Sequence, residues 1–431
     1  MQNYLLSTLD AGERVVSERL ETVRSVAIGF WIGAGSRDED DGRTGISHFL
    51  EHLLFKGTRS FTAQEIAETF DGLGGELNAS TSREYTVVYA RVLDEHLETA
   101  LDIMTDMVFT PVLADLDAER EVVLEEIAMY EDTPQETIHD LITQAVFGDH
   151  PLGRPVIGAA GVVSRLTRRA LLGYHRARYV GDNIVVAAAG SLEHDRIVEL
   201  VERMSQKRGD PPARKPRRRR PHVSPPSPSV VFERKDTEQY HVCLGALGIP
   251  RSDKRRFAAA ILDGILGGSA SSRLFQEIRE KRGLAYAVYT FASQYADTGE
   301  VGVYVGTRED NLAPCLEIVA REIASVAAGE ISQAELRRAK ENMKGRVMLS
   351  MESTSSRMHR LGKSVITGSE LLSLDSILSE IESVDTDSVA ALASMLLAPE
   401  RTSAAGIGPS EERFLEAVER IHPGLVERAA A

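Results

Sequence analysis

The chain has 431 residues, of which 42% are hydrophobic and 27% are charged, and its net charge is −15 at pH 7. The length predicts two or three domains, and the composition excludes an intrinsically disordered chain. The two cysteines are too few for a disulfide framework, and the acidic balance argues against nucleic acid as the main partner.

The N-terminal residues do not resemble a targeting signal. They lack a basic start and soon reach Asp10 and Glu13, whereas a signal peptide begins with basic residues followed by an apolar stretch. No apolar run approaches the ~20 residues that a membrane span requires. We therefore expect a cytoplasmic protein with no membrane partner.

Strands and helices alternate in the first half of the chain. An apolar strand is predicted at 26–32, followed by a helix through 50–54 and a further helix that ends near Gly74. An alternating stretch at 85–92 predicts a second strand, and an amphipathic helix is predicted around 95–108.

Residues 48–52 place two histidines and a glutamate on one helical turn. His48 and His52 are four residues apart, so their side chains project from the same face and can bind one cation. Zinc lowers the pKa of its bound water toward ~7, and Glu51 lies close enough to accept the proton. The alternative is an ordinary pair of surface or core histidines, so the motif alone is only suggestive.

An acidic helix predicted at 117–131 offers a third ligand. Glu119 and Glu126 are seven residues apart, which is two helical turns, and therefore share a face. Val122 and Val123 lie between them, which predicts that this face points inward. A carboxylate on an inward face needs a partner, and a metal ion is a suitable one.

Glycine-rich residues at 72–75 precede a stretch that can form an exposed sheet edge. Glycine permits a tight turn, and Asn78 and Ala79 follow it. An edge strand offers unpaired backbone groups to an extended peptide, which is a recognition mode that tolerates many side chains. The alternative is an ordinary entry from a loop into a strand.

The clearest boundary lies at about 205–229, where seven of the 16 prolines of the chain fall. Because proline restricts the backbone, the stretch 207–228 predicts a semi-rigid linker between domains at 1–206 and 229–431. The arginines at 217–220 belong either to a solvated linker or to a site for an acidic partner.

The second half repeats the pattern of the first. Strands predicted at 241–246 and 300–305 flank a helix through 262–266. Where the first half carries its motif glutamate and second histidine, the second half carries Asp263 and Gly264, so the fold does not require the histidines. Strands covered by helices, twice over, predict an α+β architecture.

Residues 48–58, with an acidic helix whose Glu126 lies 74 residues after His52, resemble the insulinase/pitrilysin family of zinc peptidases. The resemblance is closest to bacterial relatives of the mitochondrial processing peptidase β subunit, and it covers nearly the whole chain. It implies two tandem α+β domains, each a mostly antiparallel sheet covered by helices. It also implies a zinc-dependent endopeptidase that cleaves short or unfolded peptides and works as a homodimer.

The family pattern also assigns roles to single residues. Periodicity alone leaves Glu125 and Glu126 open, whereas the resemblance selects Glu126 as the ligand that binds one zinc ion with His48 and His52. Glu119 is expected to support the site without binding the metal.

The resemblance also implies that Glu51 is the general base and that Asn78 and Ala79 lie on the substrate-binding edge.

Arg279 and Tyr286, seven residues apart in the second half, allow two interpretations. They can be a cation at a helix end and a half-buried tyrosine. Relatives in the family carry such a pair at the active site, where the tyrosine donates to the developing oxyanion. We assign these catalytic roles to Arg279 and Tyr286, with Arg282 as the alternative arginine.

Two other functions compete with a peptidase. The family includes non-catalytic binding and partner subunits that have lost the metal, but this chain keeps all four motif residues. A nucleic-acid binder acting through the arginines at 217–220 is the second alternative, which the acidic charge of the rest of the chain disfavours.

Overall fold

The computed structural model describes residues 4–207, 223 and 227–426. The chain divides into two compact units. Unit 1 comprises Met1–Ala128, Arg154–Arg220 and Met348–Ser373, and unit 2 comprises Met129–Gly153, Pro221–Val347 and Leu374–Ala431. Unit 1 is formed mainly by the first half of the chain but includes residues 348–373 of the second half. Unit 2 is formed mainly by the second half but includes residues 129–153 of the first half. Most of the expected linker, including the arginines at 217–220, lies outside the described residues.

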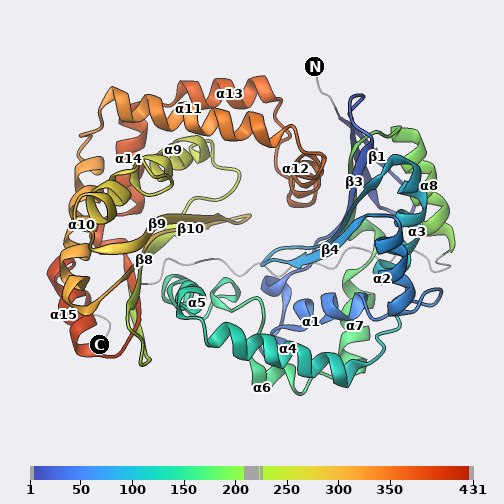
Figure 1. The fold of residues 1–431 in the computed structure, drawn as a ribbon, viewed down its shortest axis with the longest axis horizontal. Coiled ribbons are helices and arrows are strands. Elements are labelled where there is room, and N and C mark those ends of the chain that lie inside the picture. Colours follow the sequence, from blue (N-terminus) through green and yellow to red (C-terminus); the bar gives the residue numbers. More distant parts are fainter. Residues whose placement is uncertain (1–3, 208–222, 224–226, 427–431) are drawn as a thin grey trace. The chain divides into compact units, whose positions relative to one another are not determined.

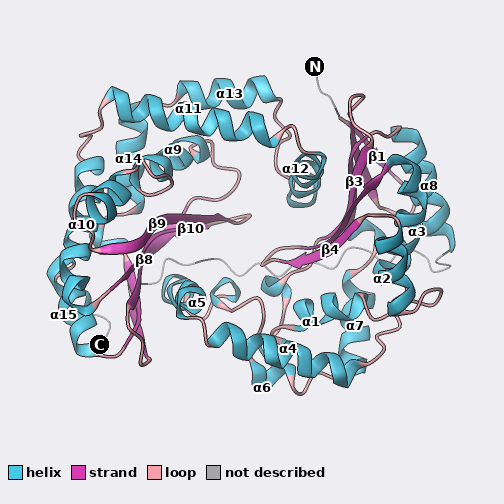
Figure 2. Ribbon diagram, viewed as in Figure 1, coloured by secondary structure: helices cyan, strands magenta, loops and turns pink. Residues whose placement is uncertain are grey.

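Unit 1 is built on a six-stranded sheet (Figures 1 and 2). In sheet order, its strands are β1 (Leu5–Thr8), β2 (Arg14–Arg19), β6 (Ile184–Gly190), β3 (Ser25–Ile32), β5 (Thr86–Leu93) and β4 (Glu76–Thr81). β2 and β6 run parallel, and the other neighbours are antiparallel. This order leaves β4 at one edge of the sheet.

Helices cover both faces of this sheet because side chains of a strand alternate between its faces. Ile28 and Phe30 of β3 are buried in the main core of the unit, whereas Ala27 and Trp31 belong to a second apolar cluster on the opposite face. The helices are α1 (Ile46–Leu54), α2 (Ala63–Gly72), α3 (Leu97–Phe109), α4 (Leu116–Glu131), which begins in unit 1, α6 (Ala160–Val163), α7 (Arg168–Arg178), α8 (His194–Lys207) and α12 (Thr354–Thr367). The second cluster lies under α12, which comes from the second half of the chain.

Unit 2 repeats the sheet of unit 1 with one strand fewer. Its order is β7 (Val230–Arg234), β11 (Ser403–Gly408), β8 (Tyr240–Gly248), β10 (Gly299–Thr307) and β9 (Ala285–Gln294). β7 and β11 are parallel and the rest antiparallel, which matches unit 1 without β1. The prediction of two α+β domains, each with a mostly antiparallel sheet covered by helices, is confirmed.

The helices of unit 2 include one from the first half of the chain. They are α5 (Pro134–Phe147), α9 (Arg256–Leu266), α10 (Leu312–Ala327), α11 (Gln333–Ser350), which begins in unit 2, α13 (Leu374–Ser383), α14 (Thr386–Leu396) and α15 (Glu411–Ile421). Helix α5 packs on β8 and β11 of this unit, where Ile142 is fully buried.

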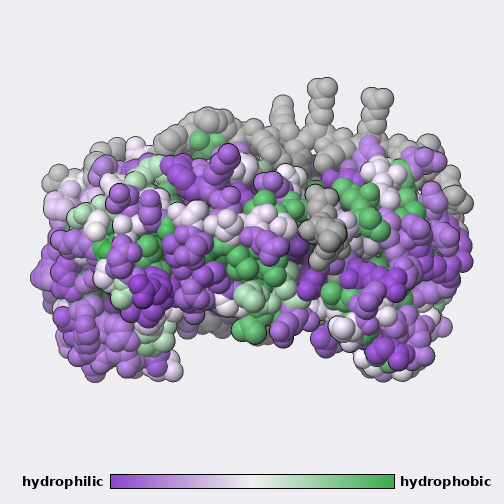
Figure 3. All heavy atoms as spheres, turned by 90° about the horizontal axis from the view of Figure 1, so that it is seen from above, coloured by the Kyte–Doolittle hydropathy of each residue, from purple (hydrophilic) through white to green (hydrophobic). Residues whose placement is uncertain are grey.

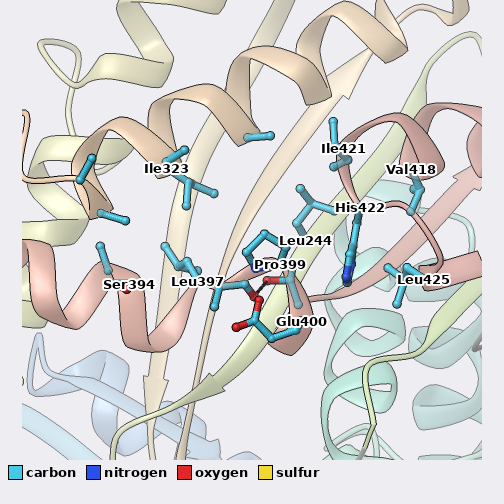
Figure 4. Close-up of a pocket in the computed structure, with 17 residues that line it drawn as sticks. Leu244, Ile323, Ser394, Leu397, Pro399, Glu400, Val418, Ile421, His422 and Leu425 are labelled. Carbon is cyan, nitrogen blue, oxygen red and sulfur yellow. Dashed lines mark hydrogen bonds between the residues drawn. The ribbon is translucent and has the colours of Figure 1, made fainter.

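Unit 2 contains an apolar cavity of about 470 Å³ between α10, α14 and α15 (Figure 4). None of the residues that the sequence assigns to the active site lines this cavity, so the candidate site is built elsewhere. Hydrophilic side chains dominate the face of the molecule drawn in Figure 3, with smaller hydrophobic patches between them. Within the described residues, every helix is too short or too polar to cross a membrane.

Candidate metal centre

Helix α1 holds the motif histidines on the side that faces away from the core. Phe49, Leu50 and Leu53 are fully buried in the core of unit 1. With 100° between successive residues, His48 and His52 therefore lie on the opposite face, one turn apart. Their ring centroids are 4.7 Å apart.

The N-terminus of α1 is fixed by a buried carboxylate. Glu39 accepts hydrogen bonds from the backbone N–H groups of Gly45 and Ser47, each at 2.8 Å. Burial raises the pKa of Glu39 to about 7, although the hydrogen bonds from Ser47 and Gly45 act in the opposite direction. Gly45 has a φ of +85°, and a Cβ there would lie 2.7 Å from the Ile157 carbonyl oxygen, so this turn requires glycine.

Helix α4 brings a carboxylate to both histidines. Glu126 Oε1 lies 3.7 Å from His48 Nε2, and Glu126 Oε2 lies 3.2 Å from His52 Nε2. One ligand atom from each of the three residues lies within 4.8 Å of the others. Glu125 is exposed and takes no part in this cluster. Of the two glutamates that periodicity left open, the structure therefore brings Glu126 to the histidines.

Glu119 lies behind His52, on the side away from Glu126. The Nδ1 atom of His52 lies 2.9 Å from Glu119 Oε1, and Glu119 is 5% exposed. Since a carboxylate only accepts, Nδ1 is the donor in this contact, and Nε2 is the ring nitrogen that faces Glu126. The Nζ atom of Lys56 lies 2.6 Å from the other oxygen of Glu119.

The facing atoms of His52 and Glu126 suit a cation. Nε2 of His52 lies 3.2 Å from Oε2 of Glu126, and Oε2 is buried with no hydrogen-bond partner among the described residues. A cation shared by the two side chains would compensate this buried oxygen, and imidazole nitrogens with a carboxylate oxygen form a common zinc ligand set. Burial, together with neighbouring His52, lowers the pKa of His48 to about 4, so His48 is neutral at pH 7 and can bind a metal.

Glu51 projects from α1 beside the two histidines. The Thr81 hydroxyl of β4 donates a hydrogen bond to Glu51 Oε2. Burial raises the pKa of Glu51, and the hydrogen bond from Thr81 partly opposes this effect. The site therefore holds two imidazoles, a carboxylate and a second, partly buried carboxylate that can accept a proton.

Comparisons with known proteins identify the family. The family model described as "Insulinase (Peptidase family M16)" matches residues 14–160, and the model described as "Peptidase M16 inactive domain" matches residues 165–343. The chain belongs to peptidase family M16. The predicted membership of the insulinase family is therefore confirmed, and residues 165–343, which match the inactive domain, lack the motif histidines.

Curated relatives of this M16 chain are named as zinc proteases. An uncharacterised zinc protease of Streptomyces coelicolor is 43% identical over 414 residues, which are 94% of this chain and 90% of the relative. The uncharacterised zinc protease YmxG of Bacillus subtilis is 41% identical over 391 residues, 90% of this chain and 94% of the relative. A protease from Helicobacter pylori, 24% identical, has the same fold with a TM-score of 0.88, covering 94% of this chain and 99% of that one.

The M16 chain carries the predicted substrate residues Asn78 and Ala79 on the edge strand β4. Asn78 is exposed, and its Oδ1 accepts a hydrogen bond from the backbone N–H of Ala79 at 2.8 Å. Among the described strands, β4 pairs with β5 alone, so its other edge can take an extended peptide. The role of these two residues in binding substrate stays a prediction.

Arg279 and Tyr286 contact each other in unit 2. Arg279 lies in a π-helical turn (Phe275–Glu280), its guanidinium carbon is 4.3 Å from the centre of the Tyr286 ring, and its NH1 donates to the Tyr286 carbonyl oxygen at 3.3 Å. Tyr286 is 75% exposed, which excludes the half-buried alternative, and Arg282 bonds to Glu277 instead. The catalytic roles of Arg279 and Tyr286 stay predictions.

Sequence reasoning missed two contacts of the M16 site and placed one residue wrongly. The spacing of four residues between His52 and Lys56, just beyond the end of α1, was a usable signal for the first contact. No local pattern showed that the strand of Thr81 meets Glu51. Val122 was expected on the inward face of α4, but it is 52% exposed. Neighbouring residues on a helix are rotated by 100° from each other, so of the two valines only Val123 is buried.

Proposed function

We propose that this chain is a zinc-dependent endopeptidase that cleaves short or unfolded peptides, with Glu51 as its general base. The observation that supports the proposal is the convergence of His48, His52 and Glu126 beside Glu51. Membership of the M16 family and relatives named as zinc proteases support the same chemistry.

The residues of the site divide the work of hydrolysis. His48, His52 and Glu126 would hold zinc, which polarises a carbonyl group and acidifies water when bound. Glu51 takes a proton from the attacking water and transfers it to the leaving amine. The hydrogen bond from Thr81 orients the Glu51 carboxylate, and the burial that raises the pKa of Glu51 makes it a better base than an exposed glutamate.

The edge strand β4 supports a peptide as the substrate. A chain that pairs with a sheet edge must be extended, so short or unfolded peptides fit this mode and folded domains do not. We further propose that Asn78 and Ala79 bind the substrate, that Arg279 and Tyr286 assist catalysis, and that the protein works as a homodimer.

A single set of measurements tests the proposed function. The purified full-length chain should contain about one zinc ion, and it should cleave members of a random peptide library, as read by mass spectrometry. Glu51→Gln should retain the zinc and lose cleavage, whereas His52→Ala should lose both. A chain that binds peptides and zinc without cleaving any member of the library would be a non-catalytic binding subunit.

A further inference from the structure

The two histidines of the candidate metal centre are supported unequally. His52 Nδ1 donates to Glu119, whereas His48 Nδ1 is buried and has no hydrogen-bond partner among the described residues. The orientation of a metal-binding imidazole is set by the hydrogen bond of its other nitrogen. Among the described residues, His52 is therefore the histidine of this pair whose second ring nitrogen is held by a hydrogen bond, and its partner is Glu119.

Glu119 in turn pairs with a lysine, Lys56. Its side chain is 6% exposed, and its two oxygens are divided between His52 Nδ1 at 2.9 Å and Lys56 Nζ at 2.6 Å. A buried carboxylate is costly unless it is paired with a charge. Without the ammonium group, Glu119 loses the partner that balances its charge and fixes its second oxygen.

The backbone places Lys56 where it can reach Glu119. Lys56 follows His52 by four residues and lies in the turn just beyond α1, which ends at Leu54. Its N–H donates to the Leu53 carbonyl oxygen at 3.2 Å, which holds this turn closed. Gly57, with a φ of +103°, then directs the chain away from the helix.

We propose that Lys56 is a positioning residue of the metal site, which acts through Glu119 to hold Nε2 of His52 toward the metal. The inference rests on the proposed function, because it takes His48, His52 and Glu126 as the zinc ligands. In this role Lys56 contacts neither the metal nor the substrate. It holds the carboxylate of Glu119, which in turn holds the ring of His52.

The test is the zinc dissociation constant of the full-length chain, measured by competition with a chelator. Loss of a direct partner of a metal ligand, here Glu119, typically costs 10–100-fold in affinity, so Lys56→Met should raise the dissociation constant measurably, by up to about that factor. Lys56→Arg keeps the charge and should therefore bind zinc more tightly than Lys56→Met does. Lys344→Met is the matched control, since it removes a lysine that pairs with Glu341 and Glu382 in unit 2, and it should bind zinc normally.

A double-mutant cycle shows whether Lys56 acts through Glu119. Adding Lys56→Met to Glu119→Gln should weaken zinc binding no further than Glu119→Gln alone. If Lys56→Met does not fold, Lys56→Gln removes the charge and keeps a donor. In that case the cycle uses Lys56→Gln in place of Lys56→Met, alone and combined with Glu119→Gln.

Two results overturn the inference: zinc binding by Lys56→Met as tight as in the unchanged chain, or additive effects of the two substitutions. Absence of zinc from the unchanged chain would instead remove the proposed function itself. The visible spectrum of the cobalt-loaded chain should also change in Lys56→Met and not in Lys344→Met, because it reports the geometry of the ligands.

Discussion

Thr81 donates a hydrogen bond from its hydroxyl to the carboxylate of Glu51, so that the edge strand β4 holds the proposed base of α1. A second pair of this kind occurs in unit 2, where Thr290 of the edge strand β9 donates to Asp263 Oδ1 of α9 at 2.5 Å. The second pair lies in the half without the motif histidines. In both units a threonine of an edge strand therefore holds a carboxylate of a helix, and in unit 1 this contact lies beside the candidate metal centre.

Thr81→Val should lower kcat while leaving the zinc content unchanged. A hydrogen bond to a charged group contributes about 1.5–3 kcal/mol, so misorientation of Glu51 should cost about tenfold or more in kcat. Steady-state kinetics and metal analysis of the purified variant measure the two effects. Thr290→Val is the matched control and should keep its kcat. Equal kcat values in Thr81→Val and the unchanged chain would remove Thr81 from the mechanism.

The third ligand can be tested with two adjacent glutamates. Glu126→Gln should weaken zinc binding strongly, because it removes the carboxylate whose oxygens lie within 3.7 Å of His48 Nε2 and 3.2 Å of His52 Nε2. Glu125→Gln should bind zinc normally, since Glu125 is exposed on the same helix. Metal content after dialysis distinguishes the variants, and reversed contents would move the ligand to Glu125.

Tyr286→Phe tests the proposed donor from the second half of the chain. A donor aimed at a developing oxyanion is typically worth ~10²–10³ in kcat, so the variant should lose about that factor. Its zinc content and thermal unfolding should be unchanged, because the hydroxyl belongs to a side chain that is 75% exposed. Full kcat in Tyr286→Phe would leave Arg279 and Tyr286 as surface residues.

Glu39 predicts a pH dependence of stability. Its folded pKa of about 7 lies above the unfolded value of about 4.3, so the folded state binds more protons between these values. The contribution of Glu39 to the free energy of unfolding is therefore fully present below pH ~4.3 and is lost as the pH rises to about 7, by an amount on the order of 3 kcal/mol.

Urea unfolding of the metal-free chain at several pH values measures this effect. Glu39→Gln should flatten the slope of stability against pH, whereas the exposed Glu125→Gln should not. An unchanged slope in Glu39→Gln would mean that Glu39 keeps an ordinary pKa in the folded chain.

Local patterns were sufficient to predict much of this fold and site. The strand predicted at 26–32 corresponds to β3 (Ser25–Ile32), and the helix predicted at 117–131 corresponds to α4 (Leu116–Glu131). Both could be predicted because the pattern of residue types is local to each element. The pairing of His48 and His52 could be predicted for the same reason, since residues four apart on a helix share a face, whereas Glu126 was selected by the family resemblance.

Contacts between distant segments could not be predicted in this way. The residue that pairs with Glu51 comes from a strand 30 residues away, and no periodicity states which helix that strand meets. The exchange of α5 and α12 between the units is the largest such case. An apolar face on a helix shows that it is buried, but not against which sheet.

Helix α12 completes the core of unit 1 from the second half of the chain. Met358 and Leu361 are fully buried with Trp31, the single tryptophan of the chain. Gly362 permits this close approach, because a Cβ on it would lie 2.0 Å from Trp31 Nε1. A fragment of residues 1–206 therefore lacks part of its own core and should expose Trp31 to water.

Gly362→Ala tests whether α12 docks on Trp31 in solution. Overpacking of a close contact costs typically 1–3 kcal/mol, so the variant should be less stable by about that amount, and its tryptophan emission should shift to the red as Trp31 becomes exposed. Gly345→Ala in α11 is the matched control: a Cβ on Gly345 meets no atom within 4 Å, and alanine favours a helix by about 0.8–1.0 kcal/mol over glycine. Gly345→Ala should therefore be at least as stable as the unchanged chain, with unshifted emission. Chemical unfolding followed by fluorescence measures both variants. Equal stability of the two would show that α12 does not pack against Trp31, and the first half of the chain would then form its core without help from the second.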